Sequence, residues 1–178
     1  RLFVGLGRTV NKVGVGTLYE LDSHAALPVA VKHPTSISEA EFSRDGKQLA
    51  TCSEDGRIVV SDAETMQKQY EIPPLAGRPF TLRFAAKDAT LWVGFADGCI
   101  RVWDCAARNW KAEFRLPGDD SLDAVAMDRE GRILAASGAS GVVCLWNTET
   151  LELAADQLEH HAQLVKIESE TIVSIAFG

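Results

Sequence analysis

The segment with the clearest potential for ligand chemistry is rich in glycine and covers residues 5–16, Gly5-Leu6-Gly7-Arg8-Thr9-Val10-Asn11-Lys12-Val13-Gly14-Val15-Gly16. Glycine lets backbone groups approach a phosphate or turn carbonyl oxygens toward a hard cation. A dinucleotide-binding site needs a third glycine three residues after Gly7, followed by a helix. That position is Val10, and the next segment reads as a strand. A Walker loop is excluded too, because no Gly-Lys-Ser/Thr sequence follows.

Two interpretations of this segment remain open. In the first, it is a loop that binds a cation or a partner, through Gly5, Gly7, Arg8, Asn11, Lys12 and Gly14. In the second, it is a flexible surface insertion between two strands. Long loops in compact domains are often functional, so the first interpretation stays beside the second.

The other reactive side chains form no recognisable catalytic or metal-binding set. His160 and His161 are adjacent, so on a strand they would point to opposite faces and be poor joint ligands. No nucleophile elbow occurs. The carboxylate pairs Asp119-Asp120 and Glu168/Glu170 fall in predicted loops and are expected to be solvated. The spacing of the cysteines suits neither zinc nor redox chemistry, so we expect reduced thiols in the core: Cys52, Cys99, Cys105 and Cys144.

Composition narrows the class of protein. The chain has 178 residues with 46% hydrophobic and 24% charged residues, which is typical of a globular protein. Its net charge of −7 argues against a nucleic-acid partner, which requires a basic face. No apolar run is long enough for a membrane-spanning helix, and no signal peptide is visible. We therefore expect a cytoplasmic protein with no cofactor and no membrane segment. Because both ends fall in or beside predicted strands, we also expect a piece of a longer protein.

A seven-residue unit recurs four times along the chain and must position any functional loop. Its best copy is Gly98–Asp104, an Asp-Gly turn followed by an alternating strand that ends in Trp-Asp. The copies begin at Gly16, Gly56, Gly98 and Gly141, which are 40, 42 and 43 residues apart. Around each copy the pattern predicts four short antiparallel strands, here called a to d. Repetition at this period is the signature of a β-propeller, in which stacked blades cover each other's faces.

The predicted fold is therefore all-β, a β-propeller or a fragment of one, forming a single region over 1–178. Residues 1–34 form a partial blade without strand a. Full blades are predicted over 35–74, 79–117 and 121–159. Residues 171–178 form the first strand of a further blade or close the ring. Strand d is predicted to start six residues after the closing Asp or Asn in every unit, at Pro28, Lys68, Trp110 and Leu153.

These repeats resemble the WD-repeat family over nearly the whole chain. The resemblance is carried by Ser53–Gly56, by Asp97–Asp104 and by Leu145–Asn147. The Gly-His pair that usually precedes strand a is absent, and the nearest candidate in the second unit is His33. Ser61 replaces the signature tryptophan there. We therefore expect the Asp–His–Ser–Trp hydrogen-bond network of the family to be incomplete and not to hold the blades together.

A narrower resemblance rests on the long glycine-rich segment with Lys12-Val13-Gly14-Val15 in the first unit. It is similar to the prolactin regulatory element-binding protein family, endoplasmic-reticulum propellers that act as exchange factors for Sar-type small GTPases. That resemblance implies a potassium ion in the loop, a small GTPase as partner, a role in vesicle budding, and a place on the cytosolic face of the endoplasmic reticulum. The four consecutive glycines expected of that family are reduced to Gly5 and Gly7.

Function is expected to lie in the loops. Loops joining strand d to the next strand a should emerge on one rim beside the turns between strands b and c, where propellers recruit partners. Rim contacts are predicted at Arg78, Asp119 and Asp120, with Arg8 of the glycine-rich loop. The sequence thus predicts a non-catalytic scaffold that binds other proteins. The alternative is a guanine-nucleotide exchange factor for a Sar-type GTPase, and no motif supports an enzyme.

Overall fold

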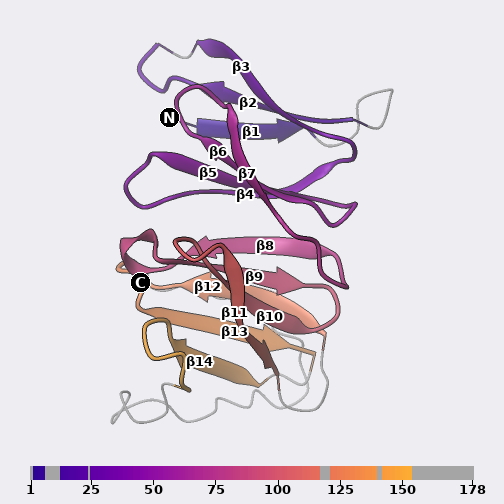
Figure 1. The fold of residues 1–178 in the computed structure, drawn as a ribbon, viewed down its shortest axis with the longest axis vertical. Coiled ribbons are helices and arrows are strands. Elements are labelled where there is room, and N and C mark those ends of the chain that lie inside the picture. Colours follow the sequence, from indigo (N-terminus) through magenta and orange to yellow (C-terminus); the bar gives the residue numbers. More distant parts are fainter. Residues whose placement is uncertain (1, 7–12, 24, 117–120, 140–141, 154–178) are drawn as a thin grey trace. The chain divides into compact units, whose positions relative to one another are not determined.

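The structure is a computed structural model that describes residues 2–6, 13–23, 25–116, 121–139 and 142–153 (Figure 1). These residues form antiparallel sheets and one short 3-10 turn at Ala86–Asp88. The predicted all-β class is confirmed. The chain divides into two compact units, Arg1–Leu82 and Arg83–Gly178, and the division falls within strand β8. Each unit is described by itself.

Unit 1 holds two sheets. Sheet A has the strand order β1-β2-β3, and sheet B has the order β4-β5-β6-β7. The strands are β1 (Leu2–Leu6), β2 (Gly14–Tyr19), β3 (Ala26–His33), β4 (Ile37–Phe42), β5 (Gln48–Ser53), β6 (Ile58–Asp62) and β7 (Lys68–Ile72). Sheet A begins with the second strand of the predicted pattern, as the sequence indicated for the first unit.

The core of unit 1 lies between these two sheets. It contains Leu18, Val31, Leu49, Ala63 and Met66, all buried, with half-buried side chains packed against them at Phe3, Ala40 and Phe42. The ring of Phe3 fills the space in which a Cβ atom on Gly16 would lie, and β1 packs against β4. Because apolar side chains come from both sheets, neither sheet buries its face alone.

Sheet C has the strand order β11-β10-β9-β8, and all of it except the first residues of β8 belongs to unit 2. Unit 2 also contains sheet D, in the order β12-β13-β14. Their strands are β8 (Pro79–Phe84), β9 (Thr90–Phe95), β10 (Cys99–Asp104), β11 (Asn109–Arg115), β12 (Leu122–Met127), β13 (Ile133–Gly138) and β14 (Val143–Asn147). Rings from both sheets meet. Phe114 stacks on Trp92 with centroids 5.5 Å apart and lies 5.8 Å from Trp146. The contact of Phe114 on β11 with Trp146 on β14 joins sheet C to sheet D.

The predicted strands agree closely with the observed ones. The start predicted for strand d of the second unit, Lys68, is the observed start of β7. The constant start of strand d is wrong in two places, since β3 begins at Ala26 and β11 at Asn109. The pairing of β10 with β11 extends to Asp104 and Asn109, whereas that of β6 with β7 ends at Ser61 and Lys68, so β11 starts one residue earlier than predicted. The pairing of β2 with β3 extends to Tyr19 and Ala26, two residues before the predicted start.

The last predicted elements are only partly covered by the structure. Leu153, where strand d of the fourth unit was predicted to start, forms an isolated bridge with Trp146. The rest of that strand and the predicted strand within 171–178 lie outside the described residues. The predicted blade boundaries stay predictions there.

Candidate interaction rim and buried polar network

Three loop segments with mostly exposed residues meet at one end of unit 1: residues 34–36, 54–56 and 73–78, here called the loop rim. The Glu54 amide donates to the Ser36 carbonyl at 3.0 Å, and the Asp55 amide donates to Thr35 Oγ1 at 3.1 Å. A Cβ atom built on Gly56 would lie 3.9 Å from the Gly77 carbonyl oxygen. The turn between strands b and c therefore lies beside the loops that join strand d to strand a, as the sequence predicted for this unit.

The glycine-rich segment enters this rim. Gly14 is buried at the start of β2, and a Cβ atom there would collide with the Thr35 carbonyl oxygen and lie 2.9 Å from the Ile37 amide nitrogen. Gly5 lies in β1, paired with Gly16. Gly7, Arg8, Asn11 and Lys12 lie outside the described residues. Close packing of two backbones accounts for Gly14 without a ligand, and the predicted ion stays a prediction.

The predicted rim contacts are placed only in part. Arg78 is exposed at the end of the loop 73–78, as a contact residue must be. Leu75, in the same loop, keeps 38% of its surface exposed. Asp119 and Asp120 lie outside the described residues. The rim of unit 1 thus presents one guanidinium beside one exposed aliphatic side chain, a combination that suits protein contacts.

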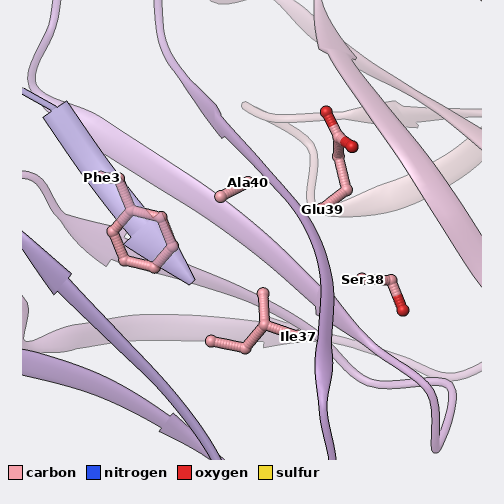
Figure 2. A pocket seen from close by; sticks show the side chains of 5 residues that line it. All are labelled: Phe3, Ile37, Ser38, Glu39 and Ala40. Carbon is pink, nitrogen blue, oxygen red and sulfur yellow. The ribbon is translucent and has the colours of Figure 1, made fainter. Parts of the chain in front are cut away.

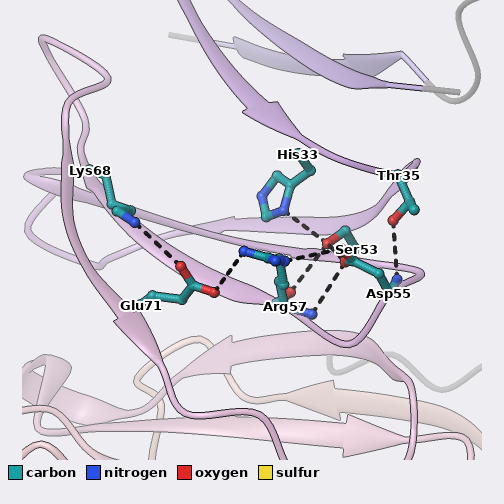
Figure 3. A network of polar contacts seen from close by, with 7 residues as sticks. All are labelled: His33, Thr35, Ser53, Asp55, Arg57, Lys68 and Glu71. Atoms are coloured by element: carbon teal, nitrogen blue, oxygen red, sulfur yellow. Dashed lines mark hydrogen bonds and ion pairs between the residues drawn. The ribbon is translucent and has the colours of Figure 1, made fainter. Parts of the chain in front are cut away.

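A buried polar network lies directly beneath the rim (Figure 3). His33 is 2% exposed and reaches from the end of β3 to sheet B. Its Nδ1 lies 2.8 Å from Ser53 Oγ, and its Nε2 lies 2.8 Å from Thr51 Oγ1. The Ser53 hydroxyl donates to Asp55 Oδ1 at 2.6 Å. The expectation that this network would not hold the sheets together is corrected: His33 supplies the imidazole that links sheet A to sheet B, although no glycine precedes it.

The protonation of this network follows from its hydrogen bonds. Because the Ser53 hydroxyl donates to Asp55, its oxygen accepts from Nδ1–H of His33, and Nε2 of the neutral ring accepts from Thr51. Burial lowers the pKa of His33 below its ordinary value of 6.5, although the charges of Asp55 and Glu71 act in the opposite direction. Burial would raise the pKa of Asp55, but hydrogen bonds from Ser53 and the Arg57 backbone, with the Arg57 charge, hold it below its usual range. The Ser53 hydroxyl thus connects the neutral imidazole of His33 to the ionised carboxylate of Asp55.

The Ser53, His33 and Asp55 set contains the residue types of a hydrolase triad but lacks its geometry. In a triad the acid orients the histidine, whereas Asp55 here contacts the serine. The second imidazole nitrogen is bound to Thr51, so it cannot move a proton to a substrate. Ser53 and Thr51 are both 0% exposed, which leaves no access for an acyl group. The arrangement stabilises the loop rim and offers no nucleophile.

In sheet C, ion pairs take the place of the histidine and serine hydrogen bonds found in sheet B. Phe95 stands at the position equivalent to Ser53, and Asp97 at that of Asp55. The guanidinium of Arg101, with an 8% exposed side chain, donates from Nη2 to Asp97 at 2.9 Å and from Nε to Glu113 at 2.7 Å. Its Cζ lies 4.5 Å from the centre of the Phe95 ring. Sequence reasoning missed this group, although Arg101 and Glu113 fall on neighbouring strands of the predicted hairpin.

Sheet D has a glycine where sheet B has Ser53, since Gly138 pairs with Leu122 as Ser53 pairs with Ile37. The neighbouring Ser137 is 0% exposed on β13, and its hydroxyl has no hydrogen-bond partner among the described residues. Trp103 Nε1 on β10 is likewise buried and unpaired in the part of the chain that the structure covers. The buried polar residues near the ends of these strands therefore differ from one sheet to the next.

A small hollow lies between β1 and β4. It measures about 240 Å³ and is lined by Phe3 and Ile37–Ala40; Figure 2 shows the Phe3 ring facing Ile37 and Ala40. Its lining combines apolar groups with Ser38 and Glu39 and includes no pair of groups suited to acid–base chemistry. Within the described ranges, no three His, Cys, Asp or Glu side chains gather as metal ligands. Among the same residues, no helix is long and apolar enough to cross a membrane.

Comparisons with known proteins agree with this architecture. Residues 18–62 match the family model described as WD domain, G-beta repeat. The chain is 30% identical over 129 residues to a WD repeat-containing protein 55 homolog from Dictyostelium discoideum, covering 72% of this chain and 31% of that protein. It is 26% identical over 158 residues to the homolog from Drosophila melanogaster, covering 85% of this chain and 31% of the relative. The chain therefore spans about a third of the length of these curated relatives.

A solved structure shows the same fold. The WD40 domain of coronin from Toxoplasma gondii matches with a TM-score of 0.70 at 17% sequence identity, covering 85% of this chain and 42% of that one. Proteins built of WD repeats generally act as scaffolds that bind other proteins. The names of these relatives mention neither nucleotide exchange nor the endoplasmic reticulum. The recurring sheets, the matched repeat model and these relatives together show that the chain belongs to the WD-repeat family and has the blade architecture of a β-propeller.

Proposed function

We propose that the chain is a non-catalytic scaffold that recruits a partner protein through the loop rim of unit 1. The observation that carries the proposal is the rigid support of these exposed loops. Two backbone amides of the 54–56 turn are bonded to residues 35 and 36, and the His33 network lies beneath them. A preorganised rim loses little conformational entropy when a partner binds.

The same polar groups argue for a binding role over a catalytic one. The residues that could act as nucleophile and base, Ser53 and His33, are buried and bonded to each other. The exposed residues of the rim, such as Arg78 and Leu75, have the character of interface contacts. Exchange-factor activity toward a Sar-type GTPase is not part of the proposal, because Gly7–Lys12, on which that resemblance depends, lie outside the described residues and no other observation favours it.

A site-specific crosslinking experiment tests this proposal. A photoreactive amino acid replaces Arg78 on the rim or, as a matched control, Arg44 in the turn at the opposite end of sheet B. Both arginines are exposed. Irradiation in cells should give defined protein adducts from position 78 that are weak or absent from position 44. Adducts of equal yield at both positions, or adducts only at position 44, would contradict the rim as the binding surface.

A further inference from the structure

A second surface of unit 1 is a cationic groove that the proposed rim function does not use. It has a volume of about 280 Å³ and lies between β3 of sheet A and β6 and β7 of sheet B. Its charged lining consists of Lys32, Arg57 and Lys68 with a single carboxylate, Glu71. Its aliphatic lining includes Val31, Val59 and Met66, which are 4%, 8% and 6% exposed. A ligand would therefore meet mainly the charged groups.

Glu71 shows how this groove holds a carboxylate (Figure 3). Arg57 Nη1 lies 3.3 Å from one of its oxygens, and Lys68 Nζ lies 3.3 Å from the other. The side chains of Arg57 and Lys68 keep 50% and 58% of their surface exposed. Arg57 Nε also pairs with Asp55 Oδ2 at 3.1 Å. Solvent reaches both cations, so a further carboxylate can approach them as well. Lys32 is exposed too, and no ion pair to it occurs among the residues that the structure describes.

We propose that this groove binds an extended acidic segment of a partner protein, whose carboxylates contact Lys32, Arg57 and Lys68. Charge complementarity carries the inference. The chain has a net charge of −7, which repels an acidic partner over most of its surface, whereas three cations and one carboxylate line the groove. The four charged residues of the groove lie outside the loop rim, although Pro34 of the rim also lines the groove and Arg57 is paired with Asp55 of the rim.

The first test is the binding of a fluorescein-labelled polyglutamate peptide to the chain, followed by fluorescence anisotropy at about 50 mM and about 200 mM salt. Lys32→Glu and Lys68→Glu should each weaken binding about tenfold at the lower salt, because each removes an attraction and adds a repulsion. Lys47→Glu is the matched control, since Lys47 is an exposed lysine of the same unit outside the groove. It should change binding less than about twofold.

A variant with the opposite expected effect makes the test sharper. Glu71→Gln removes the carboxylate that pairs with Lys68 and with Arg57 Nη1, while the Arg57–Asp55 pair remains, so it should tighten peptide binding about fivefold. The substituted residues are largely exposed, and far-UV circular dichroism checks that each variant folds. Should Lys32→Glu fail to fold, Lys32→Gln takes its place, with an expected weakening of about threefold.

Several outcomes would overturn the proposal. The first is that the peptide does not bind. The second is that Lys47→Glu weakens peptide binding as much as Lys32→Glu and Lys68→Glu do. The third is that Glu71→Gln does not tighten peptide binding. A single-stranded oligonucleotide of the same length is the competing probe. If it bound more tightly than the peptide and lost that binding in the Lys32 and Lys68 variants, the groove would be a phosphate-backbone site and the acidic-peptide proposal would be wrong.

Discussion

Replacing Ser53 with alanine tests whether the buried network supports the loop rim. The hydroxyl lies 2.8 Å from His33 Nδ1 and 2.6 Å from Asp55 Oδ1 in a fully buried position. Ser53→Ala leaves one imidazole donor unpaired and one carboxylate with a bond fewer. Hydrogen bonds to charged groups contribute about 1.5–3 kcal/mol and neutral ones about 0.5–1.5 kcal/mol. Because the Asp55 side chain is 23% exposed, water can replace part of the hydrogen bonding that its carboxylate loses. We expect the free energy of unfolding to fall by about 2–3 kcal/mol.

The matched control is Ser137→Ala. Ser137 lies on β13, one residue before the position equivalent to Ser53, and is equally buried, but its hydroxyl has no partner among the described residues. Its removal should change the free energy of unfolding by less than about 0.5 kcal/mol or stabilise the chain slightly. Urea unfolding is followed by far-UV circular dichroism, because all four tryptophans lie in unit 2: Trp92, Trp103, Trp110 and Trp146. Equal losses for the two serines would refute the reasoning that the network, rather than packing, makes Ser53 important.

Three further predictions concern other parts of the fold. Arg101→Met breaks an ion-pair group that is nearly buried and should destabilise the chain by about 2–4 kcal/mol in urea, with Arg101→Lys recovering less than half because the guanidinium fork is lost. Gly14→Ala should cost more than about 2 kcal/mol by the same assay, whereas Gly46→Ala, with φ of 70° and open space around it, should cost about 1 kcal/mol. The folded-state pKa of His33 lies below 6.5, so stability should fall as pH decreases from about 7 to 5, and His33→Gln should flatten this slope in unfolding experiments.

The repeat and its strands could be predicted because they depend on local chemistry. The Asp-Gly turns require a conformation that glycine adopts readily, as at Gly56 with φ of 92°, and they recur at a nearly constant spacing. The role of His33 could not be predicted in this way. It lies on β3, in the sheet before the one whose Ser53 and Asp55 it stabilises, and only the packing of sheet A on sheet B brings them together.

The cationic groove could not be predicted from the sequence either, because it also depends on how sheet A packs on sheet B. Lys32, Arg57 and Lys68 are far apart in the sequence, and each looks like an ordinary exposed cation on its own strand or turn. The structure brings them to one surface because β3 lies beside β6 and β7. The early starts of β3 and β11 depend on how far each strand pairs with its neighbour, which a repeat pattern read along the chain does not contain.

The most direct test of the scaffold account is hydrogen–deuterium exchange of the chain, alone and with a partner protein identified by crosslinking from position 78. The account predicts that the partner slows exchange in the loop rim, residues 34–36, 54–56 and 73–78. The turns at the opposite end of sheet B, residues 43–47 and 62–67, should be unchanged. Protection of those turns without protection of the loop rim would contradict the central claim that this protein binds its partner through the rim.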